Sequence, residues 1–297
     1  MKEKKRYKFS SLARPIELDL VTNNAIAVIA ILVLLLGIIV KSVGGMPILE
    51  ALWWGVQASL SMFLTWVLAR ELDPANELAA FVALPVAATG YYFFGFPDWL
   101  LTFYLIGIFR IINKSVGLPI KVLDVALVLL AGGWLLYDGS LLMVGLMPLP
   151  FLLDALLPQK DMRQLASFVL AAGIVAVISV FSNLTFPTPT ASVPLLLSAG
   201  VLVLSAIPVL IFIHRPSTVA DATGEKLHSI RVRATIIVAV LTCFAGSFLY
   251  GTFGISDLIL LWAALGGVYL YRFSSIFIPK TQKREIQDDR SPDDPVF

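Results

Sequence analysis

The chain has 297 residues, of which 58% are hydrophobic and only 14% are charged, and its formal net charge is +2. About 25% of the residues of an average soluble protein are charged, so this chain has too few charges to cover a water-exposed surface. The composition excludes a soluble enzyme, a nucleic-acid-binding protein, a disordered chain and a disulfide scaffold. It predicts an all-α, multi-pass membrane protein whose main partner is the lipid bilayer.

Ten apolar runs are candidates for membrane spans, each of which needs about 17–25 residues. The runs are continuously apolar, not alternating, so we expect helices instead of the strands of a β-barrel. Together they form one transmembrane domain over residues 22–272, with runs at 22–40, 49–69, 77–96, 98–112, 120–137, 141–157, 164–182, 193–213, 233–251 and 256–272. The fourth and sixth runs are short, and Pro148 and Pro150 must kink or break the sixth.

The distribution of lysine and arginine predicts the orientation of these spans. If the N-terminus is cytosolic, 21 of the 22 basic residues fall on the cytosolic side and only Lys41 falls outside, which is the bias that membrane insertion favours. We therefore expect ten spans in the plasma (cell inner) membrane, with both termini in the cytosol. Residues 1–21 then form a basic cytosolic segment, and residues 273–297 form a polar, disordered cytosolic tail.

Ten spans divide into two sets of five, and because five is odd, equivalent halves would have opposite orientations. Inverted halves of this kind are common in secondary transporters. The length, the ten spans and the two cytosolic termini are similar to those of the drug/metabolite transporter superfamily, and this resemblance concerns the fold alone.

Polar residues that interrupt the apolar runs are concentrated at the cytosolic ends of the second to sixth spans. A charge at the bilayer centre costs roughly 2.5–3.5 kcal/mol, and less near the edge, so such residues are expected to form pairs or line a wet cavity. The candidates for binding a substrate or coupling ion are Arg70, Asp73, Arg110, Asn113, Asp124 and Asp154.

Some of these residues also have simpler structural interpretations. Asp73 followed by Pro74 is typical of a helix N-cap followed by the first helical residue, and Glu77 would then lie in the first turn, where the helix dipole favours an anion. Arg110 and Asp124 could pair with each other across the short connection between their spans. Asp98 is expected to cap the fourth helix at its outer end.

Three functional hypotheses follow. We favour a small-solute secondary transporter with a cytosol-facing polar pocket in its first half, no catalytic residues and no cofactor. The alternative is an enzyme acting on a lipid or isoprenoid phosphate at the cytosolic face, in which carboxylates would hold Mg²⁺ while Arg and Lys bind the phosphate. Asp73 and Glu77, with the later Asp154 and Asp161, resemble the two acidic motifs of intramembrane prenyl transferases, although the spacing differs and the second motif lacks its close pair. The third hypothesis is a non-catalytic subunit of a membrane assembly.

Overall fold

The computed structural model describes residues 10–14, 17, 19–182, 192–212 and 218–277. This part of the chain is helical apart from its loops and one isolated bridge between Val219 and Lys226. The helices are α2 (Val21–Val43), α3 (Ile48–Leu72), α4 (Glu77–Phe94), α5 (Trp99–Asn113), α6 (Val122–Tyr137), α7 (Leu142–Leu146), α8 (Leu149–Leu156), α9 (Gln164–Phe181), α10 (Val193–Phe212), α11 (Ser229–Tyr250), α12 (Thr252–Asp257) and α13 (Ile259–Phe277).

Each predicted run coincides with a helix or with two short consecutive helices. The sixth run is broken into α7 and α8 at Met147 and Pro148, which confirms the expected effect of the prolines. The tenth is preceded by the short helix α12, and α13 continues to Phe277, into the segment predicted as a tail. Within the part of the chain that the structure describes, six helices are long and apolar enough to cross a membrane. The chain is therefore a helical membrane protein with several spans.

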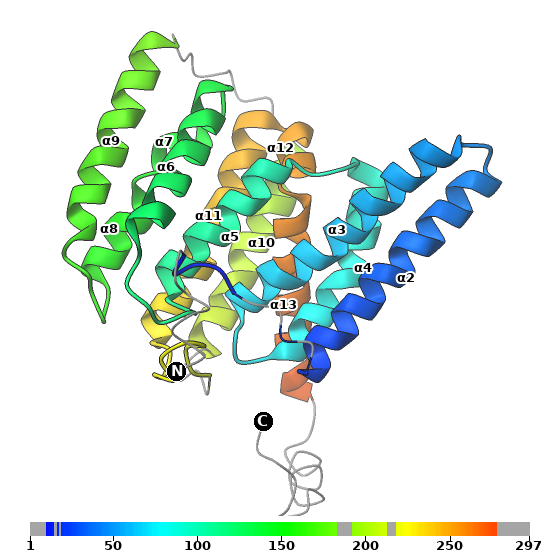
Figure 1. The fold of residues 1–297 in the computed structure, drawn as a ribbon, viewed down its shortest axis with the longest axis horizontal. Helices are drawn as coiled ribbons and strands as arrows, with labels where there is room; N and C mark the ends of the chain where they lie inside the picture. Colours follow the sequence, from blue (N-terminus) through cyan, green and yellow to red (C-terminus); the bar gives the residue numbers. More distant parts are fainter. Residues whose placement is uncertain (1–9, 15–16, 18, 183–191, 213–217, 278–297) are drawn as a thin grey trace, which may run out of the picture.

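The helices run back and forth through one layered bundle (Figure 1). The C-terminal ends of α3, α5, α8, α10 and α13 lie at one end of the bundle together with the start of α11. Because Arg70, Arg110, Lys114, Arg231 and Arg272 all lie there, we call it the basic end. The opposite end carries the α2–α3 turn and the short helix α12.

Helix α13 lies against α4 and α3 in the middle of the bundle, where small residues allow close packing. A Cβ atom added at Gly267 would lie only 2.5 Å from the Cβ of Ala83. The hairpin of α2 and α3 forms one edge of the bundle and α9 the other (Figure 1). Both edge helices turn apolar side chains outward, such as Leu36 on α2 and Val177 on α9, and such faces suit contact with lipid.

The start of α4 differs from the prediction. α3 continues through Leu72, Asp73 follows it, and α4 begins only at Glu77 with Asn76 as its N-cap residue. The interpretation of Asp73 and Pro74 as the start of this helix is therefore wrong, because the carboxylate of Asp73 instead pairs with Arg272 on α13. At the opposite end Asp98 does cap its helix, since its side chain accepts a hydrogen bond from the backbone N–H of Leu101.

Candidate functional site

One group of buried charges surrounds Glu71 in the last turn of α3. Its Oε1 atom lies 2.8 Å from Arg110 Nε and 3.5 Å from Arg14 Nη1, and Asn113 Nδ2 donates to Oε2 at 3.0 Å. Arg14 also donates to Asp221 Oδ1 at 2.8 Å. We call these five residues the Glu71 cluster. It holds two cations and two anions, so its formal charges balance.

The segment Ser10–Arg14, which we call the strap, crosses the basic end and joins three helices. The hydroxyls of Ser10 and Ser11 donate to the carboxylate of Asp124 near the start of α6, at 2.5 and 2.6 Å. The carbonyl oxygen of Leu12 accepts from Arg110 Nη1 at 2.8 Å on α5. Arg14 completes the link to Glu71 on α3. The sequence predicts a basic cytosolic segment here, and the structure adds specific polar contacts to three helices.

A second group of buried charges lies between α5, α8 and α11. Asp154 Oδ1 lies 2.9 Å from Arg231 Nη1 and 3.3 Å from Lys114 Nζ. Neither carboxylate oxygen of Asp154 has a well-aligned hydrogen bond from the described part of the chain. We call Lys114, Asp154 and Arg231 the Asp154 cluster, and its two cations face a single anion.

Arg231 is fully buried and holds the ends of two helices. Its guanidinium donates to the carbonyl oxygen of Ile112, in the last turn of α5, at 2.9 Å and to that of Pro158, after α8, at 2.6 Å. The last carbonyl groups of a helix have no partner within the helix. Arg231 thus satisfies one terminal carbonyl of α5 and one carbonyl of the loop that follows α8.

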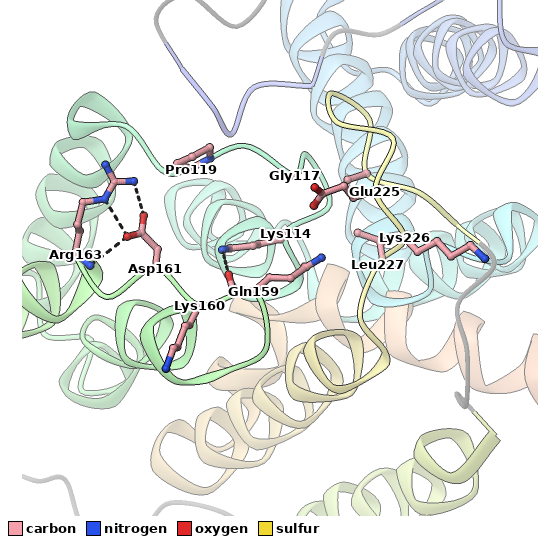
Figure 2. A pocket seen from close by; sticks show the side chains of 11 residues that line it. Lys114, Gly117, Pro119, Gln159, Lys160, Asp161, Arg163, Glu225, Lys226 and Leu227 are labelled. Carbon is pink, nitrogen blue, oxygen red and sulfur yellow. Dashed lines mark hydrogen bonds and ion pairs between the residues drawn. The ribbon is translucent and has the colours of Figure 1, made fainter.

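A pocket of about 280 Å³ opens at the basic end beside the Asp154 cluster (Figure 2). Three loops line it: the loop after α5, the loop between α8 and α9, and the loop before α11. The lining residues are Lys114, Gly117, Pro119, Gln159, Lys160, Asp161, Arg163, Ala220, Glu225, Lys226 and Leu227.

The loop before α11 is fixed to the loop after α5 by backbone contacts. The N–H groups of Asp221 and Ala222 donate to the carbonyl oxygens of Ser115 and Val116, both at 3.1 Å. Gly117 has a φ of +83°, and a Cβ added there would lie 2.7 Å from the Cβ of Ala220. Only glycine combines this backbone conformation with such a close approach. The pocket wall therefore depends on Gly117.

Cations outnumber anions among the lining side chains. Lys114, Lys160, Arg163 and Lys226 are basic, whereas only Asp161 and Glu225 are acidic. Arg163 is engaged by Asp161 through two hydrogen bonds of 3.0 Å, shown as dashed lines in Figure 2. These bonds, and more weakly the charge of Lys114, lower the pKa of Asp161. Lys114 lies between the loops in the same view, where it donates to the carbonyl oxygen of Gln159.

The six candidate residues are distributed over separate groups, and none of them lines this pocket. Arg110 and Asn113 belong to the Glu71 cluster, and Asp124 is held by the strap. Asp154 does not line the pocket, but it forms an ion pair with Lys114, which does. Arg110 pairs with Glu71 and not with Asp124, the partner considered from the sequence. That any of the six binds a substrate or ion stays a prediction.

The four carboxylates of the enzyme hypothesis lie in separate ion pairs. Asp73 receives two hydrogen bonds of 2.7 Å from Arg272, and Glu77 pairs with Arg70. Asp154 and Asp161 are held by Arg231 and Arg163, as described above. Across the described residues, no three His, Cys, Asp or Glu side chains come together as a metal site.

The fold and its buried charges define a multi-pass helical membrane protein with a polar, loop-lined pocket at its basic end. No protein-family model matches the chain, and no curated protein or solved structure matches it.

Proposed function

We propose that the protein is a ten-span transporter of the cell membrane that takes up or releases a small solute through the pocket at its basic end. In this proposal α7 and α8 together make one span, α12 and α13 form the tenth crossing, and the basic end faces the cytosol. The arginines and lysines at the ends of α3, α5, α11 and α13 support this orientation, because basic residues favour the cytosolic side.

The observation that carries the proposal is the position of the pocket. Lys114 directly follows α5, which has 15 residues, and Gln159 lies just after α8, the second half of a broken helix. Short and interrupted helices mark the binding regions of many transporters, because their ends bring backbone and side-chain polar groups into the membrane domain. The ends of these two helices are also fixed by Arg231.

The pairing of the acidic residues favours transport over metal-assisted chemistry on a lipid phosphate. A carboxylate that ligates Mg²⁺ must direct its oxygens to the ion. Here the carboxylates of Asp73, Asp154 and Asp161 are directed to basic side chains of this chain.

Blocking the pocket tests this proposal. The single cysteine, Cys243, is buried, so a Lys226→Cys variant offers one reactive thiol at the pocket. In proteoliposomes loaded with labelled small solutes of positive, negative and zero charge, we expect protein-dependent flux of one class. A bulky maleimide attached to the introduced thiol should stop this flux when it is applied from the side of the basic end.

Lys41→Cys at the opposite end is the matched control, because its thiol should react only from the other side of the membrane and should leave flux unchanged. The proposal is overturned if the labelled pocket variant conducts as well as the unlabelled one, or if no solute class crosses faster than in protein-free vesicles. Labelling of both introduced thiols from the same side would overturn the assigned topology.

A further inference from the structure

We propose that the ligand of this pocket carries an anionic group, a phosphate or a carboxylate, and that Lys114 is the side chain that contacts it. The inference rests on the proposed function only in taking the pocket as the solute site. It assigns a substrate class that the position of the pocket alone does not give.

The first argument is the charge imbalance behind the pocket wall. Asp154 and Arg231 are fully buried, and the side chain of Lys114 is 14% exposed. One carboxylate thus faces two cations, one fully buried and one that lines the pocket. Uncompensated charge is costly when it is removed from water. An anion in the pocket would supply the missing negative charge.

The second argument comes from the Glu71 cluster, where a similar arrangement of one carboxylate and two cations has its charge balanced. Glu71 is also a buried carboxylate with two cations, Arg110 and Arg14. There the more exposed cation, Arg14, has a second carboxylate, Asp221, as its own partner. Lys114 occupies the equivalent place at Asp154, and within the described residues no second carboxylate forms an ion pair with it.

The third argument identifies Lys114, and not Arg231, as the cation that meets the ligand. Arg231 lies deep in the bundle, where backbone carbonyl oxygens and Asp154 occupy its donors. Lys114 lines the pocket and has three donors on a flexible stem. Its Nζ lies 3.3 Å from Asp154 Oδ1, so it can turn to an anion while Asp154 keeps Arg231.

Two further lysines at the pocket, Lys160 and Lys226, add positive charge that would attract an anion toward Lys114. Lys160 and Lys226 are exposed at the pocket, and surface cations of this kind raise the local concentration of anions. The anionic group could belong to a soluble solute or to a lipid headgroup that reaches the pocket from the cytosolic leaflet. Both sources present the same chemistry to Lys114, and the experiment below separates them.

The test measures binding of inorganic phosphate to the purified full chain in phosphatidylcholine nanodiscs, by calorimetry at constant ionic strength. We expect saturable binding that Lys114→Gln weakens about tenfold, as the loss of one charge-assisted contact implies. Asp154→Asn should strengthen binding several-fold, because it releases Lys114 from its protein partner. Lys41→Gln, which replaces a lysine at the opposite end, should bind phosphate as the unmodified chain does.

Lys114→Gln and Asp154→Asn are expected to change the phosphate affinity in opposite directions. This distinguishes loss of recognition from damage to the fold, because general damage would weaken binding in both variants. A second series of nanodiscs contains phosphatidic acid. If the natural ligand is a headgroup, this lipid should compete with phosphate in the unmodified chain. If it is a soluble anion, the lipid should have no effect. Absence of saturable phosphate binding together with absence of phosphatidic acid binding would overturn the proposal, as would a shift of the two variants in the same direction.

The outcome is independent of the blocking experiment on Lys226→Cys. Phosphate binding without a blocked flux would keep the anion site and reject transport. A blocked flux of a cationic or neutral solute, without phosphate binding, would keep the transporter and reject the anionic class.

Discussion

The Glu71 and Asp154 clusters have similar arrangements of charges, but they differ in whether a second carboxylate balances the two cations. In each, a buried carboxylate near the C-terminal end of a helix faces two cations, one of which is more exposed than the other. The strap and Asp221 cover the first cluster and balance its charge. A pocket opens beside the second, whose extra cation lines the wall. A buried ion pair is therefore not by itself evidence of a binding site, and our proposal for the second cluster depends on its unbalanced cation at a cavity.

Hydrogen bonding shows the same difference. Both oxygens of Glu71 accept hydrogen bonds, from Arg110 and Asn113. Oδ1 of Asp154 has two ion-pair partners, and neither of its oxygens accepts a well-aligned hydrogen bond from the described residues. A fully satisfied polar network makes a structure rigid, and the carboxylate of Asp154 lacks the hydrogen bonds that would fix it in this way. The Glu71 cluster is thus expected to stabilise the bundle, and the Asp154 cluster to respond to a ligand.

The largest effect is expected from Arg231→Met. The substitution breaks the fully buried ion pair with Asp154 and removes the donors to the carbonyl oxygens of Ile112 and Pro158. Breaking a buried ion pair in this way costs about 3–5 kcal/mol, so Tm of the purified protein in detergent should fall by many degrees. Arg163→Met, which removes an exposed pair, should leave Tm unchanged. An unchanged Tm in Arg231→Met would show that neither the ion pair nor the carbonyl contacts of Arg231 stabilise the bundle.

A smaller effect is expected from Glu71→Gln. The amide keeps an oxygen that can accept from Arg110, but it loses the charge that attracts Arg110 and Arg14. We expect a loss of roughly 1.5–3 kcal/mol, as for hydrogen bonds to charged groups, together with faster deuterium exchange at the strap amides. Asp154→Asn serves as the matched control, because it should leave exchange in the strap unaltered. Equal exchange in the two variants would show that the clusters are not independent.

Gly117→Ala tests the pocket wall. The new methyl group would clash with Ala220 at a backbone conformation that alanine adopts with strain, at a cost of about 1–3 kcal/mol. We expect the loop before α11 to move and phosphate binding to weaken. Gly139→Ala is the control for strain alone, since Gly139 has a φ of +102° and no atom within 4 Å of an added Cβ. It should lower Tm slightly and leave phosphate binding intact.

The sequence predicts the helices well and the pairing of charges poorly. Apolar runs and prolines act locally, so the ten runs and the break at Pro148 can be located without a structure. The partners of Asp73 and Asp124 lie on segments 199 and 114 residues away, Arg272 and Ser10. Such pairs depend on how helices pack. For the same reason Arg231, which the sequence indicates only as an orientation signal, proves to hold the ends of two helices.

The smallest expected effect concerns the pair that closes the Glu71 cluster. Burial raises the pKa of Asp221, and the charge of Arg14 offsets this only in part. The carboxylate should therefore take up a proton at a pH above the ordinary value for aspartate and release Arg14. Since a raised pKa means that the folded chain binds this proton more tightly than the unfolded chain, acid in this range does not lower global stability through Asp221. The change is local: strap amides should exchange faster as the pH falls through the pKa of Asp221, after correction for the intrinsic pH dependence of exchange.

In Asp221→Asn the exchange of the strap should be fast at every pH, with global stability within about 1 kcal/mol of the unmodified chain, as expected for a partly exposed pair. This variant also gives the Glu71 cluster the unbalanced cation that the Asp154 cluster has by nature. If lack of a second carboxylate is what makes a cluster bind anions, Asp221→Asn should acquire a weak additional phosphate site that Arg14→Gln abolishes. No additional binding in this variant would mean that the open pocket, and not the charge count, distinguishes the two clusters.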